Sequence, residues 1–162
     1  MEVAAFRILV AGVGNKLMGD DGFGPRVVEL LSSRSLPENV DLKDLGTSGI
    51  TAAMEIEGYD LVIFLDSMKM EGDPGTIRQV EIDVHDMTEQ DVLGLTEISL
   101  HEAGLEELIK FSKAIGTIPP RIILIGCKPK IIRPGIELSD EVEQASHEAE
   151  KKVLEIIRQV ST

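Results

Sequence analysis

Three side chains that can bind a metal ion come from three separate segments of the chain: Asp21, Asp66 and His101. His101 is expected at the start of a helix, where the helix dipole disfavours the imidazolium, and neutral imidazole is the form that ligates metals. Two carboxylates and one imidazole would form a facial ligand set with positions left open for water or substrate. The three residues are therefore a candidate site for metal-assisted chemistry.

The elements that must position these residues alternate between strands and helices. Apolar or alternating patterns predict strands at Phe6–Gly12, Val40–Leu45, Leu61–Leu65, Thr76–Val84 and Arg121–Cys127. Helical periodicity and capping residues predict helices over 22–33, shortly after 46–49, over 100–115 and over 139–160. This order predicts one α/β domain over residues 1–162, with three α/β/α layers and a mostly parallel but mixed sheet of about five strands. Because sites in such sheets lie beyond the carboxyl ends of strands, Asp21 and Asp66 are expected at the same edge.

Structural roles compete with the chemical ones for the acidic residues. Asp20 or Asp21 could cap the helix that follows, and Asp66 could be a turn residue at the start of segment 67–70. Asp66 follows an unbroken apolar run. Its carboxylate must face the strand end, a partner or a metal, because an unpaired buried charge is strongly unfavourable.

Several common site types are excluded by the motifs. The loop after the first strand has Leu17 where a dinucleotide loop needs its third glycine, and it lacks the Gly-Lys-Ser/Thr of a phosphate loop. The chain also lacks a Ser/His/Asp arrangement, a catalytic Cys–His motif and His-Glu-x-x-His. The single cysteine, Cys127, ends an apolar strand with no histidine nearby in the sequence, and is interpreted as a small hydrophobic core residue.

Composition narrows the class of partner. The chain has 162 residues, 16 Lys and Arg against 29 Asp and Glu, and a formal charge of −13. This charge argues against a nucleic-acid or anionic-membrane binder, although Lys128, Lys130 and Arg133 could form a small basic patch. No apolar run reaches the roughly 20 residues of a membrane-spanning helix, and the N-terminus does not resemble a signal peptide. A cytoplasmic location is expected.

Four blocks of the chain, in order, resemble the hydrogenase maturation protease family. The first is Gly12-Val-Gly-Asn15 with Asp20-Asp21-Gly22-Phe-Gly24, and the second is Asp44-Leu-Gly46-Thr47-Ser-Gly49 with Tyr59-Asp60 and the strand before Asp66. The third is Ser99-Leu-His101-Glu-Ala-Gly104-Leu, and the fourth is Cys127-Lys-Pro129 with Leu138-Ser139. The resemblance covers nearly the whole chain.

The resemblance implies a twisted sheet between helix layers and an endopeptidase. Such an enzyme removes the C-terminal extension from the precursor of a [NiFe] hydrogenase large subunit after nickel insertion. It implies that the metal-binding and catalytic residues are Asp21, Asp66 and His101, although many relatives carry Glu at the first of these positions. Residues that resemble the cleft-shaping positions are Asn15, Gly46, Thr47 and Gly49. The resemblance assigns no role to Cys127.

Nickel is expected to arrive with the precursor, held by that protein's cysteines, and other divalent cations are expected to occupy the site in vitro. A metal-polarised carbonyl or metal-activated water could provide hydrolysis, and a carboxylate acting as general base is the competing account. Two other functions stay open: a metal-binding or chaperone module that holds the large subunit without cutting it, and a small-molecule hydrolase on the same scaffold. The protein is expected to be a monomer.

Overall fold

The central sheet is built from five strands whose order differs from their order in the chain. The computed structural model describes residues 5–47, 49–83 and 103–161. The strands are β1 (Ile8–Val13), β2 (Val40–Gly46), β3 (Leu61–Ser67), β4 (Ile77–Asp83) and β5 (Arg121–Cys127). They are arranged β2-β1-β3-β5-β4, and β4 alone pairs antiparallel to its neighbour. The predicted mixed, mostly parallel sheet is confirmed.

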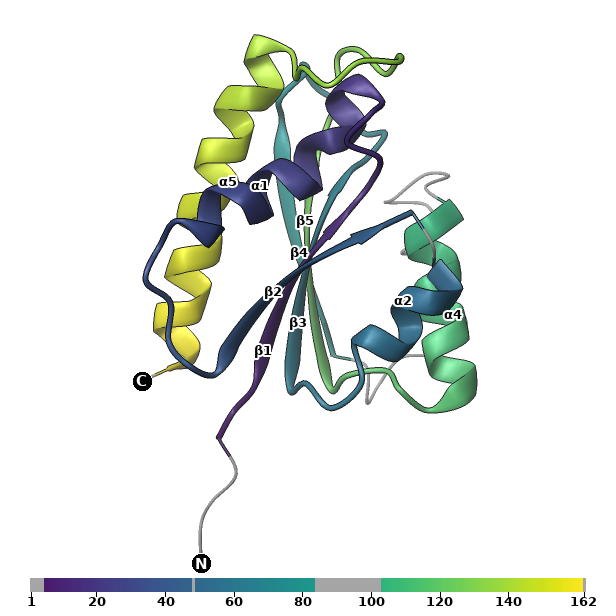
Figure 1. Ribbon diagram of the computed structural model, residues 1–162, viewed down its shortest axis with the longest axis vertical. Coiled ribbons are helices and arrows are strands. Elements are labelled where there is room, and N and C mark those ends of the chain that lie inside the picture. Colours follow the sequence, from purple (N-terminus) through teal and green to yellow (C-terminus); the bar gives the residue numbers. More distant parts are fainter. Residues whose placement is uncertain (1–4, 48, 84–102, 162) are drawn as a thin grey trace, which may run out of the picture.

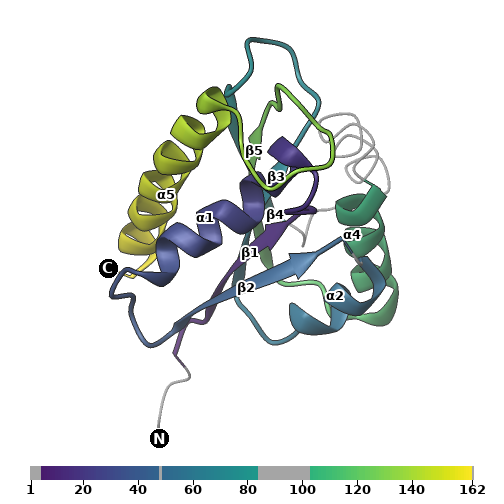
Figure 2. The ribbon, with the colours of Figure 1, turned by 45° about the horizontal axis from the view of Figure 1, so that its top comes forward.

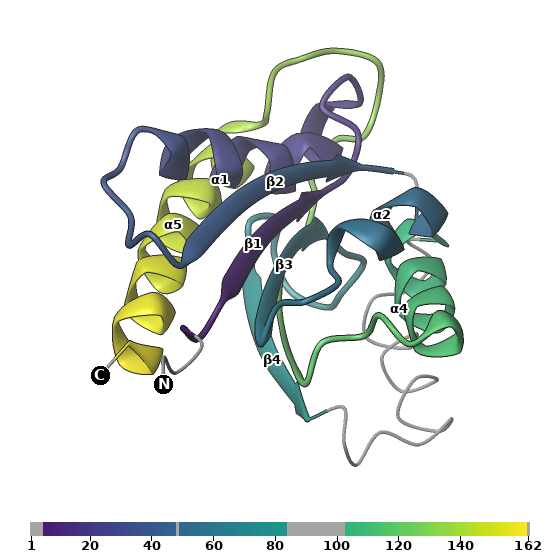
Figure 3. The same cartoon turned by 60° about the horizontal axis from the view of Figure 1, so that its bottom comes forward.

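Two pairs of helices cover the two faces of this sheet. Helices α1 (Phe23–Ser32) and α5 (Asp140–Val160) lie on one face, and α2 (Gly49–Glu55) and α4 (Ala103–Ile115) lie on the other (Figures 1 and 3). A short 3-10 helix, η1 (Gly19–Gly22), joins β1 to α1. The predicted three-layer arrangement is confirmed.

The side chains of β3 alternate between two apolar cores because successive residues of a strand point to opposite faces. Leu61, Ile63 and Leu65 pack in the core under α1 and α5, whereas Val62 and Phe64 pack in the core under α2 and α4. All five are fully buried, which explains why the sequence of this strand is apolar at every position instead of alternating between apolar and polar residues. This alternation sets the direction of the polar residues that follow.

The structure corrects one strand boundary that matters for the site. The strand predicted over Leu61–Leu65 continues through Asp66 and Ser67, which pair in register with Gly126 and Cys127 of β5. The interpretation of Asp66 as a turn residue is therefore wrong, since its backbone belongs to the sheet. The predicted cap of the last helix is confirmed, because the side chain of Ser139 accepts a hydrogen bond from the backbone of Val142.

Some predictions fall outside the described residues. These are the loop at 86–96, the first turn predicted for the helix over 100–115, and His101 itself. In the part of the chain that the structure describes, no helix combines the length and apolar character needed to cross a membrane. The organisation of residues 1–162 as one domain stays a prediction.

Candidate functional site

The Asp21 carboxylate is held between two segments at the carboxyl edge of the sheet. One oxygen, Oδ2, accepts a hydrogen bond of 2.7 Å from the backbone amide of Asn15. The other, Oδ1, accepts a hydrogen bond of 2.8 Å from the hydroxyl of Ser67, at the end of β3. The side chain of Asp21 thus ties the loop after β1 to the neighbouring strand. Among the described residues, each oxygen accepts one hydrogen bond, which leaves a lone pair on each for a ligand from elsewhere.

Gly14 allows the loop to pass this close to Asp21. Its φ of +132° is a conformation that only glycine adopts readily. A Cβ at this position would overlap the carbonyl oxygen of Asp21. The backbone amide of Gly14 also donates a 3.0 Å hydrogen bond to the carbonyl of Gly46, so the loop is joined to the end of β2 as well.

Asp66 precedes Ser67 on β3 and is fully buried, with a relative exposure of 0%. Its position in the strand alternates with that of Ser67, so it belongs with Val62 and Phe64 on the face covered by α2 and α4. The structure therefore brings Asp21 into hydrogen-bond contact with the residue next to Asp66. The predicted proximity of the two acidic residues along one sheet edge fits this arrangement.

The described residues contain no cluster of three His, Cys, Asp or Glu side chains able to hold a metal. His101, the third residue of the predicted set, lies outside them. Two buried carboxylates at one sheet edge, with lone pairs on Asp21 available, fit a divalent cation that receives its remaining ligands from elsewhere. The roles of Asp21, Asp66 and His101 stay predictions.

Asp20 does not cap α1, and neither does Asp21. The N-cap position of α1 is Gly22, which makes no side-chain cap hydrogen bond. Asp20 is 1% exposed and instead binds the loop between β5 and α5. Its Oδ2 accepts hydrogen bonds from the amides of Lys130 and Ile131 and from the hydroxyl of Ser139, and its Oδ1 accepts one from the amide of Ser139. The capping interpretation is wrong because the carboxylate of Asp20 bonds to the loop before α5, and that of Asp21 bonds to Asn15 and Ser67.

Burial alone would raise the pKa of Asp20, because it disfavours the charged form. The hydrogen bonds from Ile131, Ser139 and Lys130 favour the carboxylate, and together they outweigh burial and hold the pKa of Asp20 below its usual value. Asp20 is therefore a buried negative charge that organises one loop of the site's edge.

Cys127 is buried at the end of β5. Desolvation is the main reason that its pKa is raised to about 12, and the negative charges of Asp20 and Glu148 add to the effect. A thiol with this pKa carries almost no thiolate at neutral pH, so it is a poor nucleophile and a poor metal ligand. The interpretation of Cys127 as a core residue fits this environment.

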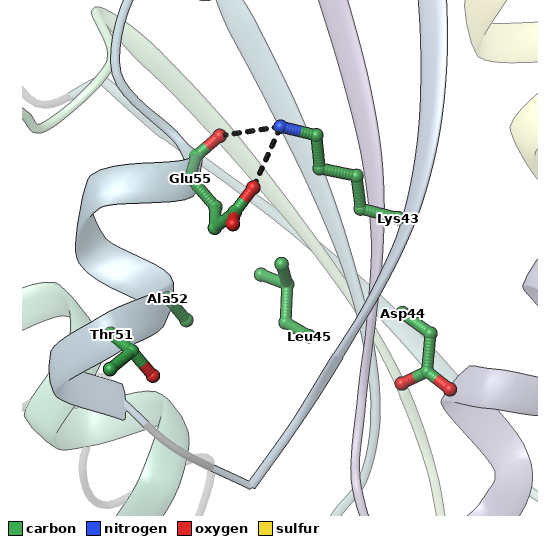
Figure 4. Close-up of a pocket in the computed structure, with 6 residues that line it drawn as sticks. All are labelled: Lys43, Asp44, Leu45, Thr51, Ala52 and Glu55. Carbon is green, nitrogen blue, oxygen red and sulfur yellow. Dashed lines mark hydrogen bonds and ion pairs between the residues drawn. The ribbon is translucent and has the colours of Figure 1, made fainter.

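The residues expected to shape a cleft come from the loop after β1 and from the junction between β2 and α2. The side chain of Asn15 accepts a 2.9 Å hydrogen bond from the amide of Leu17, which shapes the turn before η1. Gly46 ends β2 with a φ of +62°, Thr47 follows it, and Gly49 begins α2. A hollow of about 370 Å³ lies beside them between β2 and α2, lined by Lys43, Asp44, Leu45, Thr51, Ala52 and Glu55 (Figure 4). Gly46 and Thr47 are not among the described residues that line it, and the cleft-shaping role of Gly46, Thr47 and Gly49 stays a prediction.

Ser67 is a site residue that the sequence analysis missed. The available signal was the alternation of β3: once the strand is extended by two residues, Ser67 must face the α1 side, where Asp21 lies. The residues around Asp20 in the sequence do not predict its role, because its hydrogen-bond partners are more than 100 residues away in the chain.

The matching family model and similar relatives indicate the same protein family. The family model described as "Hydrogenase maturation protease" matches residues 25–156. The Hydrogenase 2 maturation protease of Escherichia coli K12 is 32% identical over 155 residues, which cover 94% of this chain and 92% of that protein. The hydrogenase expression/formation protein HupD of Bradyrhizobium diazoefficiens is 38% identical over 125 residues, or 76% of this chain. That match spans 62% of HupD, so the chain covers less than two thirds of this relative's length.

Solved structures agree with the sequence comparison. The crystal structure of a hydrogenase 2 maturation peptidase from a Thaumarchaeota archaeon is 54% identical, with a TM-score of 0.73 and coverage of 93% of this chain and 97% of that one. The hydrogenase maturating endopeptidase HybD from E. coli is 32% identical, with a TM-score of 0.80 and coverage of 95% and 93%. The chain therefore belongs to the hydrogenase maturation protease family.

Proposed function

We propose that this chain is an endopeptidase that removes the C-terminal extension of a [NiFe] hydrogenase large-subunit precursor after nickel insertion. The observation that carries the proposal is the position of Asp21. Its carboxylate is fixed at the carboxyl edge of the sheet by Asn15 and Ser67, next to Asp66, in a chain of the maturation protease family. The proposed location is the cytoplasm.

In this proposal the nickel is part of the substrate, already held by the cysteines of the precursor. Asp21, Asp66 and His101 supply oxygen and nitrogen ligands that recognise it and orient the scissile peptide. The protein's own Cys127 contributes no thiolate, because burial raises its pKa to about 12. Hydrolysis then requires an activated water, and the two sources of activation are the substrate's metal and a carboxylate general base.

The test is incubation of the protein with the nickel-loaded precursor and, in parallel, with the nickel-free precursor, followed by mass spectrometry. The proposal expects loss of a C-terminal peptide from the loaded precursor alone. Binding without a mass change would identify a chaperone, and neither binding nor cleavage would favour a small-molecule hydrolase.

Substitution then tests the site. His101→Ala should abolish cleavage of the loaded precursor while leaving the circular dichroism spectrum unchanged. His147→Ala is the matched control, because His147 lies on α5 with a half-exposed side chain whose contact is Glu143 of the same helix. Full processing by the His101 variant would overturn the assignment of the site.

A further inference from the structure

Exposed aliphatic side chains gather beside the Asp21 edge of the sheet. Seven large apolar residues are exposed in the described part of the chain, and four of them lie on the loop after β1 and the loop after β5: Leu17, Ile131, Ile132 and Ile136. Ile136 is the most exposed of them, at 78%. We call this set the aliphatic loop surface. A concentration of exposed large apolar residues marks an interaction site more often than scattered single residues do.

The two loops form one continuous surface. The amide of Gly135 donates a 2.8 Å hydrogen bond to the carbonyl of Leu17, and the amide of Gly19 donates a 2.9 Å hydrogen bond to the carbonyl of Gly135. The amide of Asp20 donates to the carbonyl of Ile131 at 2.9 Å. Figure 2 shows the loop before α5 lying across the start of η1 and α1.

A buried charge holds the surface in place. The Asp20 carboxylate receives hydrogen bonds from Lys130, Ile131 and Ser139, at the two ends of the loop that carries Ile132 and Ile136. A loop fixed in this way has already lost its conformational freedom, so a partner that binds it does not have to order it. Exposed aliphatic residues on such a loop are preorganised for contact.

Two hollows flank Ile136. One, of about 380 Å³, is lined by Ile131 and Arg133 among others, and the second, of about 300 Å³, includes Lys16. Ile136 and Leu138 line both hollows, so these two aliphatic side chains lie between them. The surface therefore offers both projections and depressions to a partner.

The charge of this surface differs from that of the whole chain. Lys16 and Arg133 are exposed here and form no ion pair within the described ranges, while the chain as a whole carries −13. Glu137 is the exposed carboxylate of the same loop, and Lys130 pairs with Glu141 at 2.8 Å. Glu29 and Asp44 line the same hollow as Lys16, so the surface carries charges of both signs. It is less acidic than the chain as a whole, and Lys16 and Arg133 are the cations that an acidic segment would meet here.

We propose that the aliphatic loop surface is the docking site for the precursor protein, which contacts it through a segment of aliphatic and acidic side chains. The inference rests on the proposed function. The amide of Asp21 donates a hydrogen bond to the carbonyl of Met18, next to Leu17, so this surface adjoins the edge of the sheet that holds Asp21. A second copy of this chain bound to this surface would compete with the substrate. The precursor, in contrast, must contact this surface and the Asp21 edge of the sheet at the same time.

The experiment measures precursor binding and processing for Ile136→Asp. A hot-spot residue at an interface is worth at least a factor of about ten, so the dissociation constant and KM should each rise about tenfold or more while kcat at saturation stays unchanged. Arg133→Glu should weaken binding further as the ionic strength falls, because it replaces attraction for an acidic segment with repulsion. Met54→Asp on α2 is the control, since Met54 is 60% exposed on the other side of the sheet.

The outcomes separate the two proposals. If the unsubstituted protein cleaves the precursor and Ile136→Asp binds it equally well, or if Met54→Asp weakens binding as much, the docking site is overturned and the proposed function stands. If the unsubstituted protein binds the precursor without cutting it, the protease function fails while the same variants still test the docking site. A concentration-dependent dimer of the unsubstituted protein that Ile136→Asp abolishes would show that the surface holds a second copy, and would also overturn the inference.

Discussion

Asp20→Asn should destabilise the protein by more than the loss of a surface charge would. The carboxylate accepts four hydrogen bonds, three at Oδ2 and one at Oδ1. An asparagine can present its single carbonyl oxygen at the Oδ2 position, but its amide group then faces the amide of Ser139, donor against donor. At least one hydrogen bond to a charged group is lost and one buried donor is left unsatisfied, which costs about 2–3 kcal/mol.

The pH dependence of this loss has a definite sign. The pKa of Asp20 is depressed in the folded protein, because its hydrogen bonds outweigh the effect of burial. A depressed carboxyl pKa contributes stability that is fully present above the unfolded pKa, about 3.9, and that disappears as the pH falls through the folded pKa. The difference in unfolding free energy between the two proteins should therefore be constant near pH 7 and should shrink below about pH 4.

Urea unfolding at a series of pH values measures this difference directly. A loss of 2–3 kcal/mol would lower the midpoint of thermal unfolding by roughly 4–12 °C for a chain of this size. Asp140→Asn is the matched control, because Asp140 is exposed at the start of α5 and loses the same formal charge. The reasoning about Asp20 is refuted if Asp20→Asn is as stable as the control at pH 7, or if the difference persists unchanged into acid.

Two further substitutions and one chemical labelling experiment test other contacts. Ser67→Ala should slow precursor cleavage about tenfold by removing one hydrogen bond to the site carboxylate, whereas Ser146→Ala, a buried serine bonded within α5, should leave cleavage kinetics unchanged. Gly14→Ala should cost about 3 kcal/mol or more in urea unfolding, because backbone strain adds to steric overlap; Gly116→Ala, at φ +78° in open space, should cost only about 1–2 kcal/mol. Native Cys127 should resist iodoacetamide at pH 8 and react after unfolding, since its pKa is raised to about 12; rapid labelling of the folded protein would contradict its buried environment.

The fold could be predicted from the sequence because its signals are local. The apolar runs at 8–13, 61–65 and 121–127 are strands that helices cover on both faces, and such strands have no polar face to interrupt the run. The cap at Ser139 was equally visible, since it depends on residues three positions apart. The end of β3 was missed because Asp66 and Ser67 are polar residues that remain in the ladder through pairing with β5, which the local pattern does not contain.

The candidate site was predictable only in part. The rule that sites lie at the carboxyl ends of parallel strands placed Asp21 and Asp66 at one edge, and the hydrogen bond from Ser67 to Asp21 agrees with that placement. Asp20 was interpreted as a cap because caps are local, whereas its actual partners come from the loop before α5. Two adjacent aspartates therefore have different structural roles, and no pattern of neighbouring residues distinguishes them.

The alternation of β3 limits where a shared ligand can bind. Ser67 and Asp21 meet on the side of the sheet covered by α1 and α5, whereas Asp66 has the strand position that faces α2 and α4. The strand itself separates these two sides, so one ligand can reach both carboxylates only beyond the strand's carboxyl end. The loop after β1, which carries Leu17, starts at this same end of the sheet, because β1 and β3 are parallel neighbours. The same geometry that brings the two acidic residues to one edge thus supports the proposal that the precursor docks on the adjoining loops.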